Sequence, residues 1–207
     1  MKLKIVTAGE PVLRTRARAL SVEEIRGAET RKLVEHMRET LHDAPGVGLA
    51  APQVGLPLQL AVIEDKAEYH TALSEAELRD RERKPVPFHV LVNPQLTILP
   101  GPEVLFFEGC LSLPGFTAMV PRPARVAVDA LNHDGEPVHI EATGWYARIL
   151  QHEIDHLRGT IYIDRMKSRS FSSLDNYTRH WKMKAQRELL QEFLMLDQSM
   201  QQENTGD

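Results

Sequence analysis

The chain has 207 residues, of which 42% are hydrophobic and 26% charged, values typical of one globular domain. Its net charge of −4 gives no reason to expect binding to DNA or to an anionic membrane, and no run approaches the roughly 20 apolar residues of a membrane span. The single cysteine, Cys110, excludes an internal disulfide and suits a reducing cytosol, and the first residues lack a secretory signal or an Arg- and Ser-rich leader, so we expect a bacterial, cytoplasmic location.

The N-terminal part of the chain predicts one helix, an irregular segment and a strand. Ser21 and Glu24 have the spacing of a capping box, in which each side chain accepts a hydrogen bond from the backbone of the other. Apolar residues then recur at helical spacing, which predicts one helix over roughly 25–42. GVGLAAPQVG at 46–55 contains too much glycine and proline for a regular element. LQLAVIED at 58–65 predicts a strand.

The middle of the chain predicts a charged loop and then a series of strands. Residues 66–87 carry dense charge of both signs, which is typical of a solvated loop with room for one helical turn. Asp134 and Gly135 form a favourable pair for the turn of a β-hairpin. The strand-like runs cover 89–99, 104–113, 118–131 and 137–142.

The C-terminal part predicts two helices. Thr143 can cap the first helix and Gly159 can end it, with apolar residues at helical spacing between them. A short strand over 161–164 and a second helix over about 172–198 follow, and residues 201–207 have a disordered composition. Helix, strands and helix in this order are typical of an α+β fold. We expect mixed or antiparallel strands around the central helix, with an N-terminal helix and a C-terminal helical extension.

QHEIDH at 151–156 has the pattern of a catalytic metal site. On a helix, residues four apart are separated by about 40° around the axis, so His152 and His156 point the same way and can bind one metal ion. Glu153 lies about 100° from His152, too far round to be an easy ligand but close enough to reach water on the metal. One helical turn therefore supplies two ligands and a general base, as in hydrolytic metalloenzymes.

A catalytic metal needs a third protein ligand, and the sequence offers two candidates. Cys110, in EGCLSLPG, is the better one, because its thiolate would bind Zn²⁺ or Fe²⁺ strongly beside two imidazoles. Asp175 lies near the separation at which one class of zinc metallopeptidase supplies a carboxylate, whereas the third-histidine position of another class holds Tyr162, a poor ligand. A zinc metallopeptidase of the HExxH type is therefore the alternative, together with a non-catalytic protein whose metal only braces the fold.

Three stretches together resemble one protein family. GVGLAAPQVG, EGCLSLPG and QHEIDHLRG, in this order, are similar to the signature segments of the peptide deformylases. They bracket residues 46–159, and the surrounding strand pattern fits this family over roughly residues 1–165. PGFTAMVPRPARV and TGWYARILQHEIDH resemble the branch that includes the mitochondrial-type enzymes. The resemblance implies a catalytic domain over 1–170, followed by a helical extension and a disordered tail over 171–207.

The resemblance implies removal of the N-formyl group from the initiator methionine of nascent polypeptides, with release of formate. The cofactor would be one divalent metal ion, typically Fe²⁺, with Zn²⁺, Ni²⁺ or Co²⁺ able to substitute. Glu153 would be the catalytic acid and base. Gln53 would donate its side-chain amide, and Leu111 its backbone N–H, to the formyl oxygen. Matched motif to motif, the three metal ligands would be Cys110, His152 and His156.

The same resemblance implies residues that bind the substrate and a further partner. Residues around Gly48 would pair with the substrate backbone like an added strand. Trp145 and Arg148 are bulkier than the aliphatic residues common in the family's methionine pocket, so helix packing is their alternative role. The residues that match this pocket are Val47, Trp145, Arg148 and Ile149. A basic C-terminal helix suggests docking on the ribosome, as in some family members, with a solvated face as the alternative. Its basic residues are Arg179, Lys182, Lys184 and Arg187.

Overall fold

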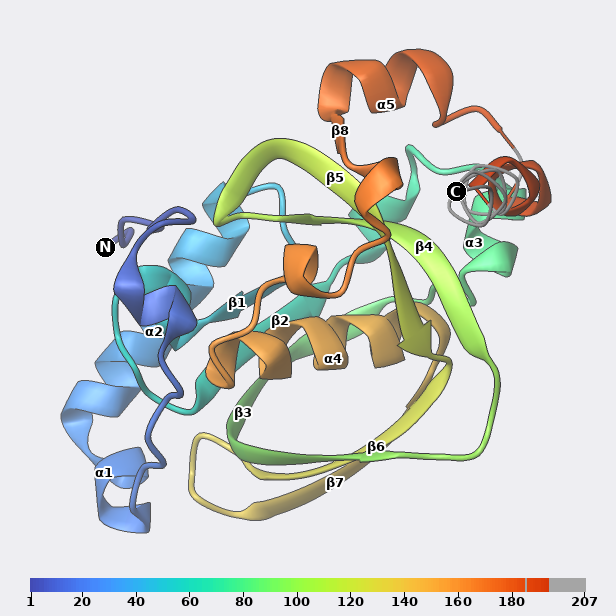
Figure 1. Cartoon of the computed structure of the whole chain (residues 1–207). Helices are drawn as coiled ribbons and strands as arrows, with labels where there is room; N and C mark the ends of the chain where they lie inside the picture. The colour runs from blue at the N-terminus through green and yellow to red at the C-terminus, as the bar shows by residue number, and fades with distance from the viewer. Residues whose placement is uncertain (185, 194–207) are drawn as a thin grey trace, which may run out of the picture.

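Two antiparallel sheets enclose one long helix, α4 (Gly144–Leu157), in the computed structural model, which describes residues 1–184 and 186–193 (Figure 1). Every pair of neighbouring strands in these sheets is antiparallel, which confirms the predicted α+β fold. The larger sheet has the order β1 (Gly48–Ala50), β2 (Leu60–Asp65), β3 (Val86–Ile98), β6 (Arg125–Leu131), β7 (Pro137–Thr143). The smaller sheet has the order β4 (Glu103–Cys110), β5 (Leu113–Pro123), β8 (Ser172–Ser173).

The single helix predicted over 25–42 is in fact two helices. They are α1 (Val22–Arg26) and α2 (Ala28–Asp43). The helical conformation is interrupted at Gly27, whose backbone is extended, with φ −65° and ψ 152°. The predicted capping box of Ser21 and Glu24 is confirmed, but it caps the short α1. The break was not predicted because apolar residues keep their helical spacing across a single glycine.

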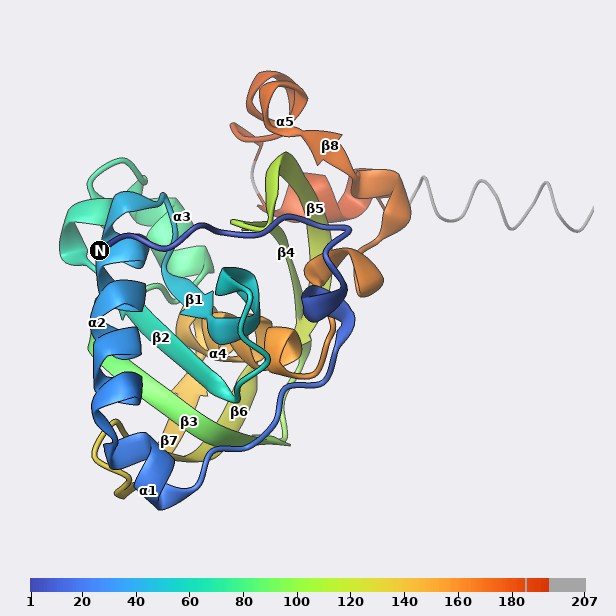
Figure 2. The same ribbon diagram turned by 90° about the vertical axis from the view of Figure 1, so that its left-hand side faces the viewer.

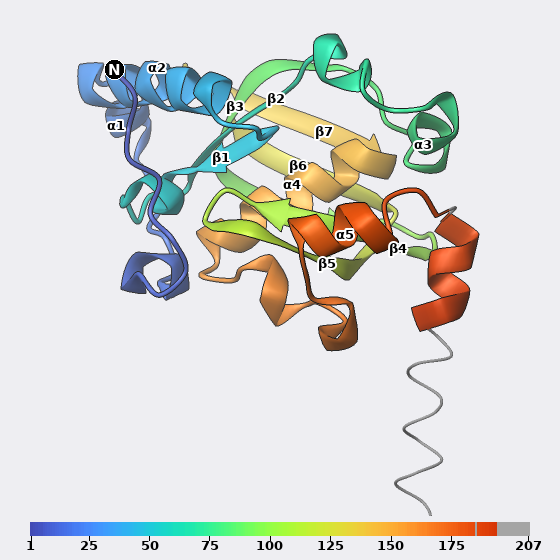
Figure 3. The same ribbon diagram turned by 90° about the horizontal axis from the view of Figure 1, so that it is seen from above.

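Strands β1 and β2 of the larger sheet are buried on both faces, which explains their nearly continuous apolar residues. Along β2, Leu60 and Val62 pack with α2, whereas Ile63 packs with α4, as the strand period of two requires. Figures 2 and 3 show α2 and α4 on opposite sides of this sheet. The α2 residues at the first face are Val34, Met37 and Leu41. The α4 residues at the second face are Ala147, Ile149, Leu150 and Ile154.

The glycine- and proline-rich segment 46–55 is more regular than predicted. It contains β1, which pairs with β2, and a short 3-10 helix, η2 (Ala51–Val54). Gly55 follows this helix in the left-handed region, with φ 85°, where glycine is favoured. The prediction was wrong because a three-residue strand takes its register from the strand beside it rather than from its own composition.

Most predicted strands are present, with shifted ends. The run 118–131, predicted as one strand, is divided at Ala124 between β5 and β6, which belong to different sheets. Prolines at 121 and 123 carry no N–H for a sheet and mark the place where the strand ends. The hairpin turn at Asp134 and Gly135 is confirmed, and Gly135 has φ 72°. The predicted loop 66–87 contains η3 (Ala67–His70) and α3 (Glu75–Asp80).

Helix α4 has the predicted ends but not the predicted cap. Thr143 occupies the N-cap position, yet its side chain makes no capping hydrogen bond, and Gly159 follows the last turn with φ 75°. Residues 161–164, predicted as a strand, form the 3-10 helix η4 (Tyr162–Asp164). A short apolar run does not distinguish helix from strand by its periodicity. The remaining 3-10 helices are η1 (Pro11–Arg14) and η5 (Ser168–Ser170).

The helix predicted over 172–198 is divided in the described residues. Strand β8 and helix α5 (Leu174–His180) are followed by a turn and by a helical segment over 186–193. Pairing of β8 with β5 fixes α5 beside the smaller sheet (Figure 1). The predicted disorder of 201–207 and the predicted helix end lie outside the described residues. None of the helices in the described part of the chain has the length and apolar character needed to cross a membrane.

Candidate metal centre

Cys110, His152 and His156 come together between β4 and α4. Each offers one ligand atom, and the three atoms lie within 4.8 Å of one another. The Cys110 Sγ is 3.3 Å from the His156 Nε2, and the two imidazole centroids are 5.0 Å apart. One thiolate and two imidazoles suit a divalent ion such as Zn²⁺ or Fe²⁺, and three protein ligands leave a coordination position for water.

The two elements position these side chains in different ways. The helical period puts His152 and His156 one turn apart on the same face of α4. Cys110 is the last residue of β4, and the register of β4 against β5 shifts between Glu108 and Cys110. Such an irregularity re-aims a side chain at the end of a strand. The backbone N–H of Ser112, in the following turn, lies 3.4 Å from the sulfur and donates to it.

A buried carboxylate orients the first histidine. His152 Nδ1 lies 2.9 Å from Glu108 Oε2, so its N–H donates to the carboxylate and leaves Nε2 for a metal. His156 Nδ1 has no hydrogen-bond partner in the described part of the chain, and burial lowers the pKa of this imidazole. The neutral imidazole is the form that binds metal. Burial lowers the pKa of His152, but hydrogen bonds to Cys110 and Glu108 outweigh burial and raise this pKa well above its usual value, so a metal ion at Nε2 would have to replace a proton there. The geometry of both rings and the neutral form of His156 fit the proposed ligand set.

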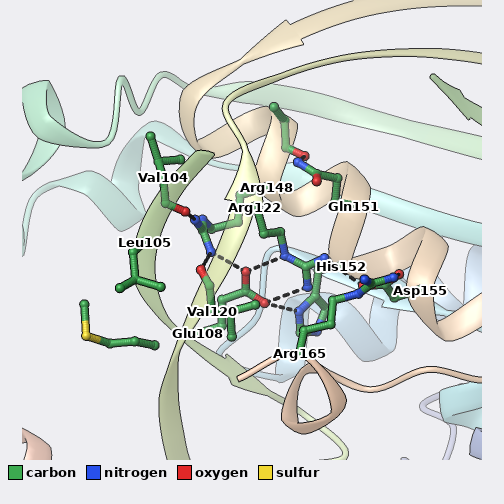
Figure 4. Close-up of polar contacts among 12 residues, drawn as sticks. Val104, Leu105, Glu108, Val120, Arg122, Arg148, Gln151, His152, Asp155 and Arg165 are labelled. Atoms are coloured by element: carbon green, nitrogen blue, oxygen red, sulfur yellow. Dashed lines mark hydrogen bonds and ion pairs between the residues drawn. The ribbon is translucent and has the colours of Figure 1, made fainter. Parts of the chain in front are cut away.

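Glu108 belongs to a buried network of charged side chains (Figure 4). Arg122 on β5 donates to its two oxygens at 2.7 and 2.9 Å, and Arg148 on α4 donates to it at 2.6 Å. Burial opposes ionisation of this carboxyl, but hydrogen bonds from Arg122 and His152 outweigh burial and hold the pKa of Glu108 well below its usual value. Glu108 is therefore an anion with three donors. Neither its role nor that of Arg122 was predicted from the sequence.

The network continues along α4 to the surface. Arg122 also donates to Asp155 at 2.7 Å, and Arg165 donates twice to Asp155, at 2.7 Å each (Figure 4). Burial works against the charged guanidinium, but Glu108 and Asp155 raise the pKa of Arg122 above its usual value. The Arg165 side chain is 45% exposed, whereas that of Asp155 is 5% exposed. Charged contacts thus run from the His152 imidazole to the solvent.

Glu153 packs directly against Gly48 of β1. A Cβ atom on Gly48 would lie 2.2 Å from the Glu153 Oε1, so a larger residue would displace the carboxyl. Glu153 is buried, and its Oε2 has no hydrogen-bond partner among the described residues. Burial raises the pKa of Glu153 to about 7, against the opposing charges of His152 and Arg122. A carboxyl with this pKa next to a candidate metal ligand can accept and return a proton near neutral pH.

Gln53 and Leu111 both lie beside the thiol. The buried Gln53 accepts a hydrogen bond from the Ala50 N–H at 2.9 Å, which turns its Nε2 toward the Cys110 Sγ at 3.5 Å. Its amide is therefore oriented as a donor next to the cluster. Leu111 lies in the turn between β4 and β5, and a Cβ on Gly46 would come within 2.9 Å of its Cδ1. Both predicted residues are thus near the cluster, while their roles stay predictions.

A cavity of about 670 Å³ opens beside the cluster, and Cys110 and His152 line it. Arg148 borders this cavity, but its guanidinium also donates to the backbone oxygens of Val120, at 2.9 Å, and Val104, at 2.7 Å. With its bond to Glu108, these contacts direct the polar atoms of Arg148 into the network (Figure 4). The other predicted pocket residues line the cavity; they are Val47, Trp145 and Ile149.

A family model described as polypeptide deformylase matches residues 2–172. The chain belongs to the polypeptide deformylase family. It is 44% identical over 172 residues to peptide deformylase 1A, chloroplastic, of Solanum lycopersicum, covering 83% of this chain and 62% of the relative. It is 49% identical over 179 residues to peptide deformylase 3 of Streptomyces avermitilis, covering 86% and 78%. The solved class I type b peptide deformylase of Acinetobacter baumannii with Met-Ala-Ser bound has a TM-score of 0.71 and 30% identity, covering 80% of this chain and 99% of that one.

The chain spans less than two thirds of the length of two plant deformylases that it matches. It covers 62% of the Solanum lycopersicum relative and 64% of the corresponding Arabidopsis thaliana protein. The relatives at 44% and 49% identity are chloroplastic and bacterial. They agree with membership of the polypeptide deformylase family, but they do not specifically favour the mitochondrial-type branch.

The same cavity also has walls that no sequence pattern indicated. Phe116 of β5 and Leu174 and Tyr177 of α5 line it, although α5 was predicted only as an extension. Arg81, from the segment predicted as a solvated loop, lines it too, with its guanidinium carbon 4.9 Å from the ring centroid of Trp145. These contacts join segments far apart in the chain, and no local pattern indicates them.

The metallopeptidase alternative lacks its third ligand. Asp175 is exposed in the first turn of α5, and the metal-binding cluster of the described residues does not include it. Tyr162, at the other position considered, is buried with its ring centroid 6.4 Å from that of His152. A larger cavity of about 990 Å³, lined by parts of α3, β3 and β7, contains none of the three candidate ligands. The smaller cavity is therefore the candidate active site.

Proposed function

We propose that this chain is a metal-dependent hydrolase that removes the N-formyl group from the N-terminal methionine of newly synthesised polypeptides and releases formate. The observation that carries the proposal is the cluster of Cys110, His152 and His156 with the Glu153 carboxyl beside it. Family membership over residues 2–172 supports it. The Acinetobacter baumannii relative was solved with Met-Ala-Ser, which is the peptide that remains when formyl-Met-Ala-Ser loses formate.

We infer that the three side chains hold one divalent metal ion and that this ion is Fe²⁺, with Zn²⁺, Ni²⁺ or Co²⁺ able to substitute. Mixed thiolate and imidazole donors suit these ions. An ion held there would act as a Lewis acid and lower the pKa of water in the site. The Glu108 carboxylate supports this assignment, because a ligating histidine almost always donates its second N–H to such a group.

The surrounding protein groups fit the hydrolysis of a formamide. Glu153 accepts a proton from water as the water oxygen attacks the formyl carbon. Gln53 Nε2 and the Leu111 N–H donate to the formyl oxygen, where negative charge builds up, and removal of one such donor typically costs about 10²–10³ in rate. The C–N bond then breaks, Glu153 returns the proton to the nitrogen, and formate and a free amino terminus result.

The cavity walls suit the residue that carries the formyl group. We infer that Val47, Trp145 and Ile149 hold the methionine side chain. The outer edge of β1 at Gly48, which borders the cavity, would pair with the substrate backbone, because β1 is the edge strand of the larger sheet. The Arg148 guanidinium donates to Glu108, so it would stabilise this wall of the cavity without contacting the substrate.

Release of formate from formyl-Met-Ala-Ser under anaerobic conditions tests the proposal. Anaerobic conditions are needed because an Fe²⁺–thiolate centre is prone to oxidation. Glu153→Gln should keep the metal and lose about 10²–10⁴ in turnover, since general acid–base catalysis contributes that much. Metal content and the initial rate are the two measurements. Turnover of Glu153→Gln at the parent rate would show that the carboxyl has no part in the reaction.

Cys110→Ser separates the deformylase from the metallopeptidase. A deformylase that uses Cys110 as a ligand should lose most of its bound metal, because a hydroxyl is a much weaker ligand than a thiolate. A metallopeptidase that uses Asp175 would keep its metal. Metal analysis after dialysis against a chelator distinguishes the two outcomes without any activity assay.

The remaining proposals concern the extension and the surroundings of the enzyme. We infer a catalytic domain over 1–170 with a C-terminal extension over 171–207, a bacterial cytoplasmic location, and a place near the mitochondrial-type branch.

Docking on the ribosome would use the basic residues of the extension, of which Lys184 pairs with Glu192 and Arg179 is exposed. Deleting 172–207 should lower co-sedimentation with ribosomes at low salt. Arg179→Glu with Lys182→Glu is a cleaner test, because it keeps the buried residues Leu189 and Phe193.

A further inference from the structure

Three large apolar side chains are exposed together where the smaller sheet meets α5. Phe116 of β5 and Phe171, just before β8, stack with ring centroids 5.1 Å apart and 8° between their planes. Leu174 begins α5, and the pairing of Ser173 with Phe116 places it next to them. We call Phe116, Phe171 and Leu174 the apolar rim; their exposed fractions are 41%, 42% and 45%. Adjacent exposed apolar groups are typical of a binding surface.

The apolar rim is continuous with the candidate active site. Phe116 and Leu174 line the same cavity as Cys110, and so does Tyr177 of α5. The Tyr177 ring centroid is 4.7 Å from that of Phe107, which lies three residues before Cys110 on β4. Three residues of a strand span about 10 Å. The wall formed by α5 therefore lies about as far from the Cys110 thiol as three residues of an extended peptide can span.

The segment that carries the rim is fixed to the catalytic body. Strand β8 pairs with β5 through Phe116 with Ser173 and Thr117 with Ser172. Farther along, Leu189 and Phe193 are each 5% exposed and pack with buried residues of β4 and β5. Figure 3 shows α5 lying over β5. Because the wall is already in place, a ligand can use it without first ordering a loop.

We propose that the apolar rim and Tyr177 bind the residues that follow the formyl-methionine and select apolar side chains at the second and third positions of the substrate. This inference rests on the proposed function, since it concerns the substrate of the same site. An extended peptide rises about 3.3 Å per residue. With its formyl group at the cluster, the peptide reaches the wall formed by α5 within about three residues. The rim offers apolar surface there, so apolar side chains gain most from the contact.

The test compares kcat/KM for formyl-Met-Leu-Phe and formyl-Met-Ser-Ser with the full chain. The parent should favour the apolar peptide, and Leu174→Ser should reduce the ratio of the two kcat/KM values roughly fivefold, through loss of apolar contact area. The loss should lie in KM rather than in kcat, because the rim binds ground state and transition state alike. Phe116→Ser, on the other side of the rim, should act in the same direction.

Leu56→Ser is the matched control, because Leu56 is 38% exposed and does not line the cavity. It should leave the ratio of the two kcat/KM values unchanged. No formate from either peptide would overturn the proposed function and this inference with it. Formate release with a ratio that neither Leu174→Ser nor Phe116→Ser changes would overturn the inference alone. Reduced ribosome co-sedimentation with an unchanged ratio would assign the rim to the ribosome and would also overturn it.

Discussion

Helix α4 has two unlike sides, and the candidate metal centre lies at the border between them. Toward the larger sheet it presents buried aliphatic side chains, namely Ala147, Leu150 and Ile154. Toward the smaller sheet it presents side chains in charged hydrogen bonds to β4 and β5, namely Arg148, His152 and Asp155. The apolar side fixes where the helix lies, whereas the charged side fixes how its histidines are turned.

The physical reason is that the two kinds of contact differ in direction and in cost. Apolar burial contributes roughly 25 cal/mol per Å² and has no preferred angle, so it sets the spacing of helix and sheet. Charge-assisted hydrogen bonds require particular distances and angles, so Glu108 can set the plane and tautomer of His152. Desolvation of the buried charges offsets most of what they contribute to stability. We therefore expect the apolar side to govern the free energy of unfolding, and the charged side to govern metal affinity.

Glu108→Ala should have the largest effect, because it breaks the charged side at its centre. Arg122 and Arg148 would stay buried without their shared anion, and such a loss costs roughly 3–5 kcal/mol in the free energy of unfolding. Metal affinity should also fall about 10–100-fold, since His152 loses its acceptor. Denaturant unfolding of the metal-free protein measures the first effect, and competition with a chelator measures the second.

The matched control is Glu103→Ala, which removes an exposed glutamate from the other end of β4. It should change the free energy of unfolding by less than about 0.5 kcal/mol, as is usual for surface substitutions. Metal binding by Glu108→Ala as tight as in the parent would mean that the carboxylate does not orient His152. The charged side of α4 would then not govern metal affinity.

Leu150→Ala tests the apolar side. Leu150 is fully buried between α4 and the larger sheet, and removal of such a side chain costs about 2–5 kcal/mol in the free energy of unfolding. The folded variant should keep the metal affinity of the parent, because every contact of His152 and His156 with the smaller sheet remains. Unfolding and chelator competition are again the measurements. A fall in metal affinity as large as that of Glu108→Ala would show that the two sides do not act separately.

Helix α4 could be predicted from the sequence because its signals are local. Histidines four apart, a glutamate between them and a glycine after the last turn all lie within one element. The thiol comes from a position 46 residues away from His156, and no periodicity connects the two. The chemical need for a third ligand, together with the resemblance of three motifs, joined Cys110 to the histidines, and the cluster geometry agrees with that choice.

The charged side of α4 could not be predicted in the same way, because its partners come from separate strands. Glu108 stands in the apolar run FFEGC, two residues before Cys110, and a buried glutamate requires a cation. That signal indicates a partner but does not say which arginine supplies it. Arg148 was assigned to the methionine pocket by motif position, whereas its guanidinium points into the network. The pairing of β4 with β5 brings Arg122 to Glu108, and this pairing depends on the whole fold rather than on a local pattern.

Arg165→Ala should have a moderate effect, because it removes the solvent end of the charged network. Asp155 would lose two hydrogen bonds but keep the one from Arg122. Hydrogen bonds to charged groups contribute roughly 1.5–3 kcal/mol. Exposure of 45% of the Arg165 side chain reduces this, so we expect a loss of about 1–2 kcal/mol in the free energy of unfolding. Added salt should weaken the contribution. A loss as large as that of Glu108→Ala would mean that the network acts as one unit.

Ile154→Val should have the smallest effect, because it removes one methylene group from the apolar side without adding charge or strain. Ile154 is 1% exposed and packs among aliphatic residues of the larger sheet. Such a change costs roughly 0.5–1.5 kcal/mol in the free energy of unfolding. Although Ile154 is the direct neighbour of Glu153, its side chain faces away from the cavity, so formate release at saturating substrate should equal that of the parent. A clear drop in this rate, with the protein fully folded, would mean that the apolar side also sets the position of the Glu153 carboxyl.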